Sequence, residues 1–301
     1  MRESLGVARA FCRRYKAVLT GVFIAALLAY VFLRIDREEL RHTLSALSVG
    51  SMAAATCLIA TSQIVSALRM RLYVEASGPR MGFREAVGLY FASMFLNVFM
   101  PGGIGGDGYK CVELSARYDF PPYRSLAIAL SERASGLLAL LFLALASFAF
   151  SRAPEAIGVG PGLTACALVI AGAAVASAYR LGTGALLREK ISLSLRAFPY
   201  SLAVQLLQFS AMLLLLAGLP DANLDRWADY GLIFFLSSLL AMVPVSVGGL
   251  GVREATFFQA AEYLDGISPA AGAVAASAFF LCHLPPALCG VWRWGKKWLP
   301  E

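Results

Sequence analysis

The sequence predicts an all-α integral membrane protein, a single polytopic domain over residues 1–301 that is built from two inverted-topology repeats. Three observations support this prediction. Hydrophobic residues make up 59% of the chain and charged residues only 15%, whereas about 25% of a soluble domain is charged. Long apolar segments recur along the chain. A glycine-rich motif also occurs twice, at corresponding positions of the two halves.

The apolar segments define the expected helices. A spanning helix needs about 20 predominantly apolar residues. Six segments meet this requirement: residues 18–33, 52–75, 125–150, 159–179, 196–217 and 269–292. Two further runs, 85–100 and 229–243, are shorter and end in breaks rich in proline and glycine, which suits re-entrant half-helices. Each repeat is therefore expected to contain three spanning helices and one broken re-entrant helix pair.

Basic residues predict the orientation. If the N-terminus is cytoplasmic and both short runs return to their own side, most of the 26 Lys and Arg residues lie inside, as the positive-inside rule requires. This inside set includes Arg69 and Arg71, near the end of the second apolar segment, and Arg80 and Arg84, which follow it. No small-residue cleavage site follows the first segment, so we expect it to be retained. We expect a multi-pass protein of a bacterial inner membrane with both termini in the cytoplasm.

The two halves, about 1–158 and 159–301, share one motif. Residues 101–110 read Pro-Gly-Gly-Ile-Gly-Gly-Asp-Gly-Tyr-Lys, and residues 244–253 read Pro-Val-Ser-Val-Gly-Gly-Leu-Gly-Val-Arg. The offset between the two motifs also aligns the apolar segments of the halves, which indicates an internal repeat. Three spans separate the motifs, so the two broken helices enter from opposite sides, as in many secondary transporters. The alternative is a pair of structural kinks with small residues for close packing.

Each motif predicts a helix start at membrane depth. Glycine allows positive φ and close backbone approach, and a helix that restarts near Gly106 points its free N–H groups and the positive end of its dipole into the membrane. Such a start binds anions. A base accompanies each start, Lys110 in the first motif and Arg253 in the second. The two starts together therefore favour a membrane lipid with an anionic headgroup, such as a lipid phosphate.

Charged residues at membrane depth complete the candidate site. Because a charge in hydrocarbon is costly, these residues should face a cavity or one another. Two interpretations stay open: ion pairs that join the halves, such as Glu132 with Arg253 and Asp107 with Arg133, or a hydrated cavity that binds a headgroup. Asn97 is expected in the cavity, or else to cap freed backbone groups. The candidate substrate-binding residues are Asn97, Gly105, Gly106, Asp107, Lys110, Glu132, Arg133, Ser246, Gly248, Gly249, Arg253 and Glu254.

Composition argues against other classes of function. The chain has two histidines, His42 and His283, and six scattered cysteines without CxxC spacing. We therefore expect neither a histidine-based metal site nor a disulfide framework, and no cofactor. The net charge of +7 is spread over the ends of apolar segments, where basic residues act as topology signals. Nucleic acid is therefore not an expected partner.

Three ordered stretches of the chain resemble the signature motifs of the lysylphosphatidylglycerol synthase transmembrane-region family, also described as flippase-like membrane proteins. They begin at Pro101, Glu132 and Pro244, and the resemblance spans essentially the whole chain. It implies a region that, in fused members, moves aminoacylated phosphatidylglycerol between leaflets while a separate soluble domain makes that lipid. Stand-alone members are associated with lipid, hopanoid or polyprenyl-linked substrates. Only a short basic tail follows the last segment here, so we expect no synthase activity.

The motifs and the resemblance together predict a lipid translocator and not an enzyme. It is expected to move an anionic phospholipid, or a polyprenyl- or hopanoid-type lipid, between inner-membrane leaflets through a midplane cavity. One alternative is an intramembrane enzyme that acts on a lipid headgroup, with Asp107, Glu132 and Glu254 as acid and base. The other is a membrane scaffold for a separate lipid synthase. Two protein partners also stay open, a separate lipid-synthesising enzyme and a second copy of the chain.

Overall fold

The computed structural model describes residues 22, 24–99, 105–156, 158–160, 164, 172–173, 191–243 and 246–291. Every regular element in this part of the chain is helical, which confirms the all-α class. A helix over Ile24–Arg34 comes first. The labelled elements are α2 (Arg37–Ser45), α3 (Val49–Ala76), α4 (Phe83–Phe99), α5 (Gly105–Tyr118), α6 (Pro122–Phe150), α7 (Ala153–Ala156), α9 (Ile191–Ala217), η1 (Leu224–Arg226), α10 (Trp227–Ala241), α11 (Val252–Ala260) and α12 (Pro269–Cys289).

Four of these helices contain a segment that is long and apolar enough to cross a membrane. The segments are Val49–Ala76, Pro122–Phe150, Leu195–Ala217 and Pro269–Cys289, and they confirm four of the six predicted spans. The first predicted span appears as the shorter apolar helix Ile24–Arg34. Most of the predicted span 159–179 lies outside the described residues. The chain is a helical membrane protein.

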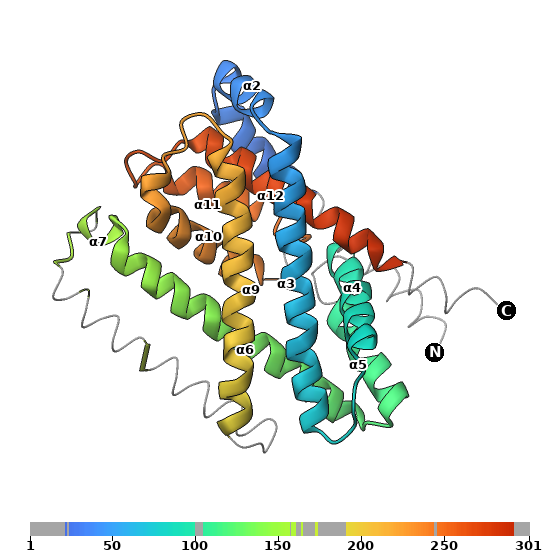
Figure 1. Ribbon diagram of the computed structural model, residues 1–301. Helices are drawn as coiled ribbons and strands as arrows, with labels where there is room; N and C mark the ends of the chain where they lie inside the picture. Colours follow the sequence, from blue (N-terminus) through green and yellow to red (C-terminus); the bar gives the residue numbers. More distant parts are fainter. Residues whose placement is uncertain are drawn as a thin grey trace, which may run out of the picture.

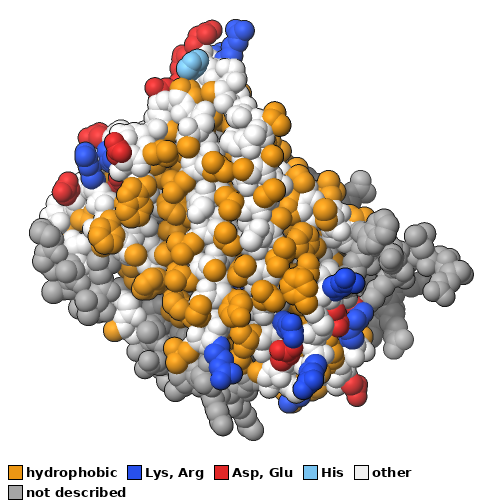
Figure 2. Space-filling model, in the orientation of Figure 1, with side chains coloured by type: hydrophobic (Ala, Val, Ile, Leu, Met, Phe, Trp, Pro, Cys, Tyr) orange, Lys and Arg blue, Asp and Glu red, His pale blue; other side chains and the backbone are white. Residues whose placement is uncertain are grey.

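The surface agrees with this assignment. Figure 2 shows hydrophobic side chains over the middle of one face, whereas basic and acidic side chains gather towards its two ends. Large apolar side chains such as Leu206 and Phe142 are about half exposed. In a lipid bilayer, such side chains contact acyl chains, while charged groups reach the headgroups and water at either end.

The core is formed by the long helices. α3 and α9 pack side by side along much of their length (Figure 1). Aromatic rings fill the space between α9, α10 and α12: the Phe209 and Phe235 ring centroids are 5.2 Å apart, and Phe234 meets Phe279 edge-on at 5.5 Å. Many of the buried positions of α12 are alanines, and small residues at an interface let helix backbones approach closely.

Helices α4 and α5 form a hairpin of two short helices. Its outer connections, from α3 and to α6, lie together at the lower end of the molecule in Figure 1. The two helices touch at Gly106, where a Cβ atom would collide with the carbonyl oxygen of Ser93. Glycine therefore permits this approach. Residues 101–104 of the first motif lie outside the described residues.

Helices α10 and α11 form the corresponding hairpin in the second half. Its outer connections, from α9 and to α12, lie at the upper end of the molecule in Figure 1. Between the two helices the backbone passes through Gly248, Gly249 and Gly251, with φ angles of 59°, 82° and 83°. L-residues rarely adopt this left-handed region, so the glycines allow the chain to end one helix and start the next.

The end of α12 is held against α4 by backbone contact. A Cβ atom on Gly290 would collide with the carbonyl oxygen of Phe91, and Gly290 itself is buried. No side chain separates the two backbones at this point. The first hairpin is thereby packed directly on the last long helix.

Candidate functional site

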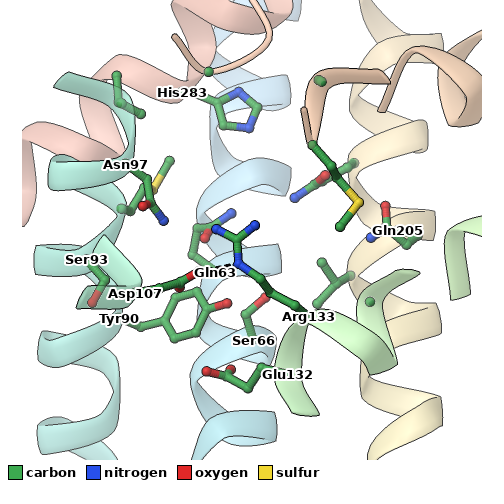
Figure 3. Close-up of a pocket in the computed structure, with 18 of the residues that line it drawn as sticks. Gln63, Ser66, Tyr90, Ser93, Asn97, Asp107, Glu132, Arg133, Gln205 and His283 are labelled. Atoms are coloured by element: carbon green, nitrogen blue, oxygen red, sulfur yellow. Dashed lines mark hydrogen bonds and ion pairs between the residues drawn. The ribbon is translucent and has the colours of Figure 1, made fainter. Parts of the chain in front are cut away.

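A polar cavity of about 370 Å³ lies inside the helix bundle, between α3, α4, α5, α6, α9 and α12. The segment that follows α10 closes it on one side with Met242, Ser246 and Gly248. Figure 3 shows polar side chains from several helices pointing into this space, among them Asn97, Gln205, Arg133 and His283. The cavity thus draws its lining from both halves of the chain.

Lys110 lies at the centre of an ion-pair network in the cavity wall. Its Nζ lies 3.0 Å from Asp107 Oδ1, one turn earlier on α5, and 3.0 Å from Glu132 Oε2 on α6. It also lies 4.8 Å from the centroid of the Tyr90 ring on α4, a cation–π contact. Only 6% of the Lys110 side chain is exposed. The ammonium group is therefore fully paired and joins three helices.

Arg133 extends the network into the cavity. Its Nε donates a hydrogen bond to Asp107 Oδ2, as the sequence predicted for this pair. The Arg133 side chain is 37% exposed, against 14% for Asp107, and its guanidinium projects into the open space in Figure 3. Arg133 is the most exposed of the charged groups in the wall.

Arg69 on α3 is a member of the network that the sequence analysis missed. The charge pattern placed it with the cytoplasmic arginines at the end of the second span, but its side chain is only 7% exposed and faces Glu132 at 3.9 Å. Its Nη1 donates a hydrogen bond to Ser201 Oγ on α9 at 2.8 Å. Its position within the apolar part of the segment was the available signal, because a charge there needs a partner.

Asn97 holds the start of α5. Its Oδ1 accepts a hydrogen bond from the backbone N–H of Gly106 at 2.8 Å, as the capping alternative predicted. The side chain also lines the cavity. One of the N–H groups that a helix start leaves free is thus satisfied by α4.

The charged residues of the second motif behave differently from the prediction. Arg253 donates from Nη1 to Ser237 Oγ at 3.1 Å and to Ser238 Oγ at 3.0 Å, and its guanidinium lies over the Phe234 and Phe279 rings. The predicted pair of Glu132 with Arg253 is therefore wrong: Glu132 pairs with Lys110 and Arg69. Sequence spacing does not determine which way a helix face turns.

Glu254 acts as a local cap. Its Oε2 accepts a hydrogen bond from the backbone N–H of Gly251 at 2.7 Å, and its Oε1 accepts one from Ser277 Oγ at 3.0 Å. The side chain thus ties the start of α11 to α12. Both carboxylate oxygens of Glu254 are thus hydrogen-bonded, and Glu254 is not among the residues that line the cavity.

The predicted site residues therefore divide into two groups. Those that line the cavity are Asn97, Asp107, Lys110, Glu132, Arg133, Ser246 and Gly248. The others, which shape the hairpins around the cavity, are Gly105, Gly106, Gly249, Arg253 and Glu254. The sequence analysis did not single out Tyr90, Ser66 or Ser93, which also line the cavity.

Two further observations concern the chemistry of the lining. In the part of the chain that the structure describes, no group of three or more His, Cys, Asp or Glu side chains is placed to hold a metal ion. His283, the one histidine in the described lining, has Nδ1 2.8 Å from the Phe279 carbonyl oxygen. The contact is local to α12, since Phe279 lies four residues before His283 on the same helix.

Comparison with known proteins agrees with this architecture. No curated protein matches the chain. A family model described as the lysylphosphatidylglycerol synthase TM region matches residues 17–290, which include both hairpins and all of the cavity lining. This match covers most of the chain and confirms the resemblance of the three motifs. The chain belongs to the lysylphosphatidylglycerol synthase transmembrane-region family, and its function concerns membrane lipid.

Proposed function

We propose that the chain is a lipid translocator of the flippase type. It moves a lipid with an anionic headgroup between the leaflets of a bacterial inner membrane and releases the lipid chemically unchanged. The two halves act as inverted repeats, with α4–α5 and α10–α11 as re-entrant hairpins. The opposite ends from which the hairpins approach in Figure 1 support this arrangement.

The observation that carries the proposal is a charged cavity within a bundle of membrane-spanning helices. Charged side chains at membrane depth are expensive and face a cavity or one another. Here the charged side chains are paired with one another, and Arg133, which is paired with Asp107, also keeps 37% of its side chain exposed. A cation placed there offers an anionic headgroup the stabilisation that the bilayer core lacks.

The route follows from the position of the hairpins. The headgroup enters the cavity while the acyl chains stay among the apolar side chains of the outer surface. Rocking of one half against the other then exposes the cavity to each leaflet in turn. In the second hairpin, Met242, Ser246 and Gly248 line the cavity, so the irregular backbone near Gly248 faces the cavity instead of lipid.

Reconstitution tests the proposal. The purified protein is placed in vesicles that contain phosphatidylglycerol labelled on an acyl chain, and a membrane-impermeant reductant bleaches the label in the outer leaflet. We expect nearly all of the label to become accessible with the protein, and only the outer-leaflet share without it. Replacement of Arg133 by Gln should slow this exchange at least about tenfold, equivalent to about 1.4 kcal/mol.

The matched control is Arg124→Gln, which removes an exposed arginine from the start of the same helix. It should leave the rate within about twofold, because exposed charges contribute little. Vesicles in which no anionic lipid exchanges would refute the proposal. Mass spectrometry of the recovered lipid distinguishes transport from chemistry, since turnover of the headgroup would instead indicate an enzyme.

A further inference from the structure

The charges of the cavity wall do not cancel. Five charged residues line the cavity among those that the structure describes: the cations Arg69, Lys110 and Arg133, and the anions Asp107 and Glu132. His283 also lines it, and its imidazole is counted with the neutral polar groups of the wall. The described wall therefore carries one more positive than negative charge.

The negative charges of the wall are already occupied. Asp107 is paired with both Lys110 and Arg133. Glu132 is paired with Lys110 and faces Arg69, and its side chain is 3% exposed. The oxygen that faces Arg69 has almost no accessible surface. A cationic group that entered the cavity would therefore find no free carboxylate among the described lining residues.

The excess positive charge lies where a ligand can reach it. The Lys110 and Arg69 side chains are 6% and 7% exposed, whereas that of Arg133 is 37% exposed. The guanidinium of Arg133 has a planar set of N–H donors, and its Nε donates to Asp107. Arginine donors match the geometry of phosphate oxygens.

Neutral polar groups surround this cation. Gln63, Gln205 and Gln208 come from α3 and α9. Ser246, from the break between α10 and α11, is only 4% exposed, and its Oγ has no hydrogen-bond partner among the described residues. A hydroxyl in that position would donate to a phosphate oxygen or accept from a headgroup hydroxyl. At about 370 Å³, the cavity falls in the ordinary range of small-ligand sites.

We propose that the cavity selects a headgroup with a single net negative charge, a phosphodiester monoanion whose remaining groups are neutral and hydroxylated. Arg133 is the residue that determines this specificity. This inference rests on the proposed function and narrows its substrate class. A lysyl ester of phosphatidylglycerol carries two ammonium groups for one phosphate, so the wall disfavours it. Zwitterionic headgroups lack the net charge that balances the site.

Binding is measured separately from transport, so that the two proposals can fail independently. Native mass spectrometry of the detergent-solubilised protein is used to titrate three lipids with identical acyl chains: phosphatidylglycerol, phosphatidylethanolamine and lysyl-phosphatidylglycerol. We expect phosphatidylglycerol to bind about tenfold more tightly than either of the others, a difference of about 1.4 kcal/mol. Arg133→Gln should abolish this preference, whereas Arg133→Lys keeps the charge and should keep most of it.

Thermal unfolding of each variant shows whether the protein is folded, and Arg124→Gln again serves as the control on α6. Equal affinity for the three lipids, or tighter binding of the zwitterionic or cationic lipid, would overturn the inference even if transport is observed. A preference for phosphatidylglycerol that survives in Arg133→Gln would overturn the assignment of Arg133. Selective binding without lipid exchange in vesicles would instead refute the proposed translocation and leave the specificity intact.

Discussion

Lys110 and Glu132 form a buried ion pair at 3.0 Å that joins the hairpin helix α5 to the spanning helix α6. Both side chains are almost fully enclosed. Removing one member of such a pair leaves its partner as an uncompensated buried charge. The pair is therefore a sensitive test of how the hairpin is held.

We expect Lys110→Met and Glu132→Gln each to lower the free energy of unfolding by about 3 kcal/mol, near the low end for a broken buried pair. The low end applies because Arg69 and Arg133 still face the carboxylates in Lys110→Met, and Asp107 still faces Lys110 in Glu132→Gln. The double variant should cost clearly less than the sum of the single variants. The free energy of unfolding of all three variants is measured in detergent micelles. Arg71→Gln is the control: it breaks a partly exposed ion pair with Glu75 and should lower the free energy of unfolding by less than about 1 kcal/mol. Strict additivity would contradict the pairing.

Alanine substitutions at two glycines of α5 are expected to change the stability of the protein in opposite directions. Gly106→Ala places a methyl group against the Ser93 carbonyl oxygen and 2.7 Å from Asn97 Oδ1, so it should destabilise the protein by about 1–3 kcal/mol or more. Gly108→Ala, two residues along the same helix, meets nothing within 4 Å and should stabilise it by about 0.5–1 kcal/mol, because alanine favours the helix. The melting temperatures of the two variants test these two expectations. Equal shifts would mean that α4 and α5 are not in contact at Gly106.

The Asn97 cap can be tested by hydrogen exchange. Asn97→Ala removes the acceptor of the Gly106 N–H group, and a lost cap costs about 1 kcal/mol. We expect amide exchange at the start of α5 to quicken about fivefold, which corresponds to that free energy. Asp36→Ala removes a cap of the same kind from the surface helix α2 and should affect α2 alone. Unchanged exchange over residues 105–110 in Asn97→Ala would argue against the cap.

Glu85 should make stability depend on pH at the edge of the bundle. Partial burial opposes ionisation of this carboxyl, but hydrogen bonds from Tyr118 and Arg117 outweigh it and lower the pKa of Glu85 below its usual value. A carboxyl with a lowered folded-state pKa stabilises the protein above its unfolded pKa of about 4.3, and this contribution is lost as pH falls through the folded value. Glu85→Gln should therefore lower the melting temperature at pH 7 and lose that effect near pH 3. The exposed Glu38→Gln serves as the control.

The sequence predicted the parts of the fold that depend on composition and local pattern. Apolar length placed α3, α6, α9 and α12 within a few residues of their ends. The glycine motifs placed the starts of α5 and α11. The rule that membrane charges pair or face a cavity correctly brought Asp107 to Arg133. These predictions need only helix periodicity, segment length and the cost of buried charge.

The cavity itself depends on how each helix is rotated about its axis, and no local pattern reports that. Arg69 was therefore placed with the exposed arginines that follow it, although it faces Glu132. Arg253 was assigned to Glu132 but turns to Ser237 and Ser238. Tyr90 lies within an apolar run and was not distinguished from its neighbours, yet its ring packs on Lys110. Tertiary packing determines each of these positions.

The contact between Gly290 and Phe91 has a mechanical consequence. Where side chains separate two helices, a small displacement of one can be absorbed by a change of rotamer. At Gly290 the two main chains touch, so no rotamer is available to take up the movement. A shift of α4 towards α12 is therefore passed on directly to the main chain at the end of α12. In the proposed rocking of one half against the other, the first hairpin and the end of α12 must therefore either turn about this contact as a pivot or separate at it.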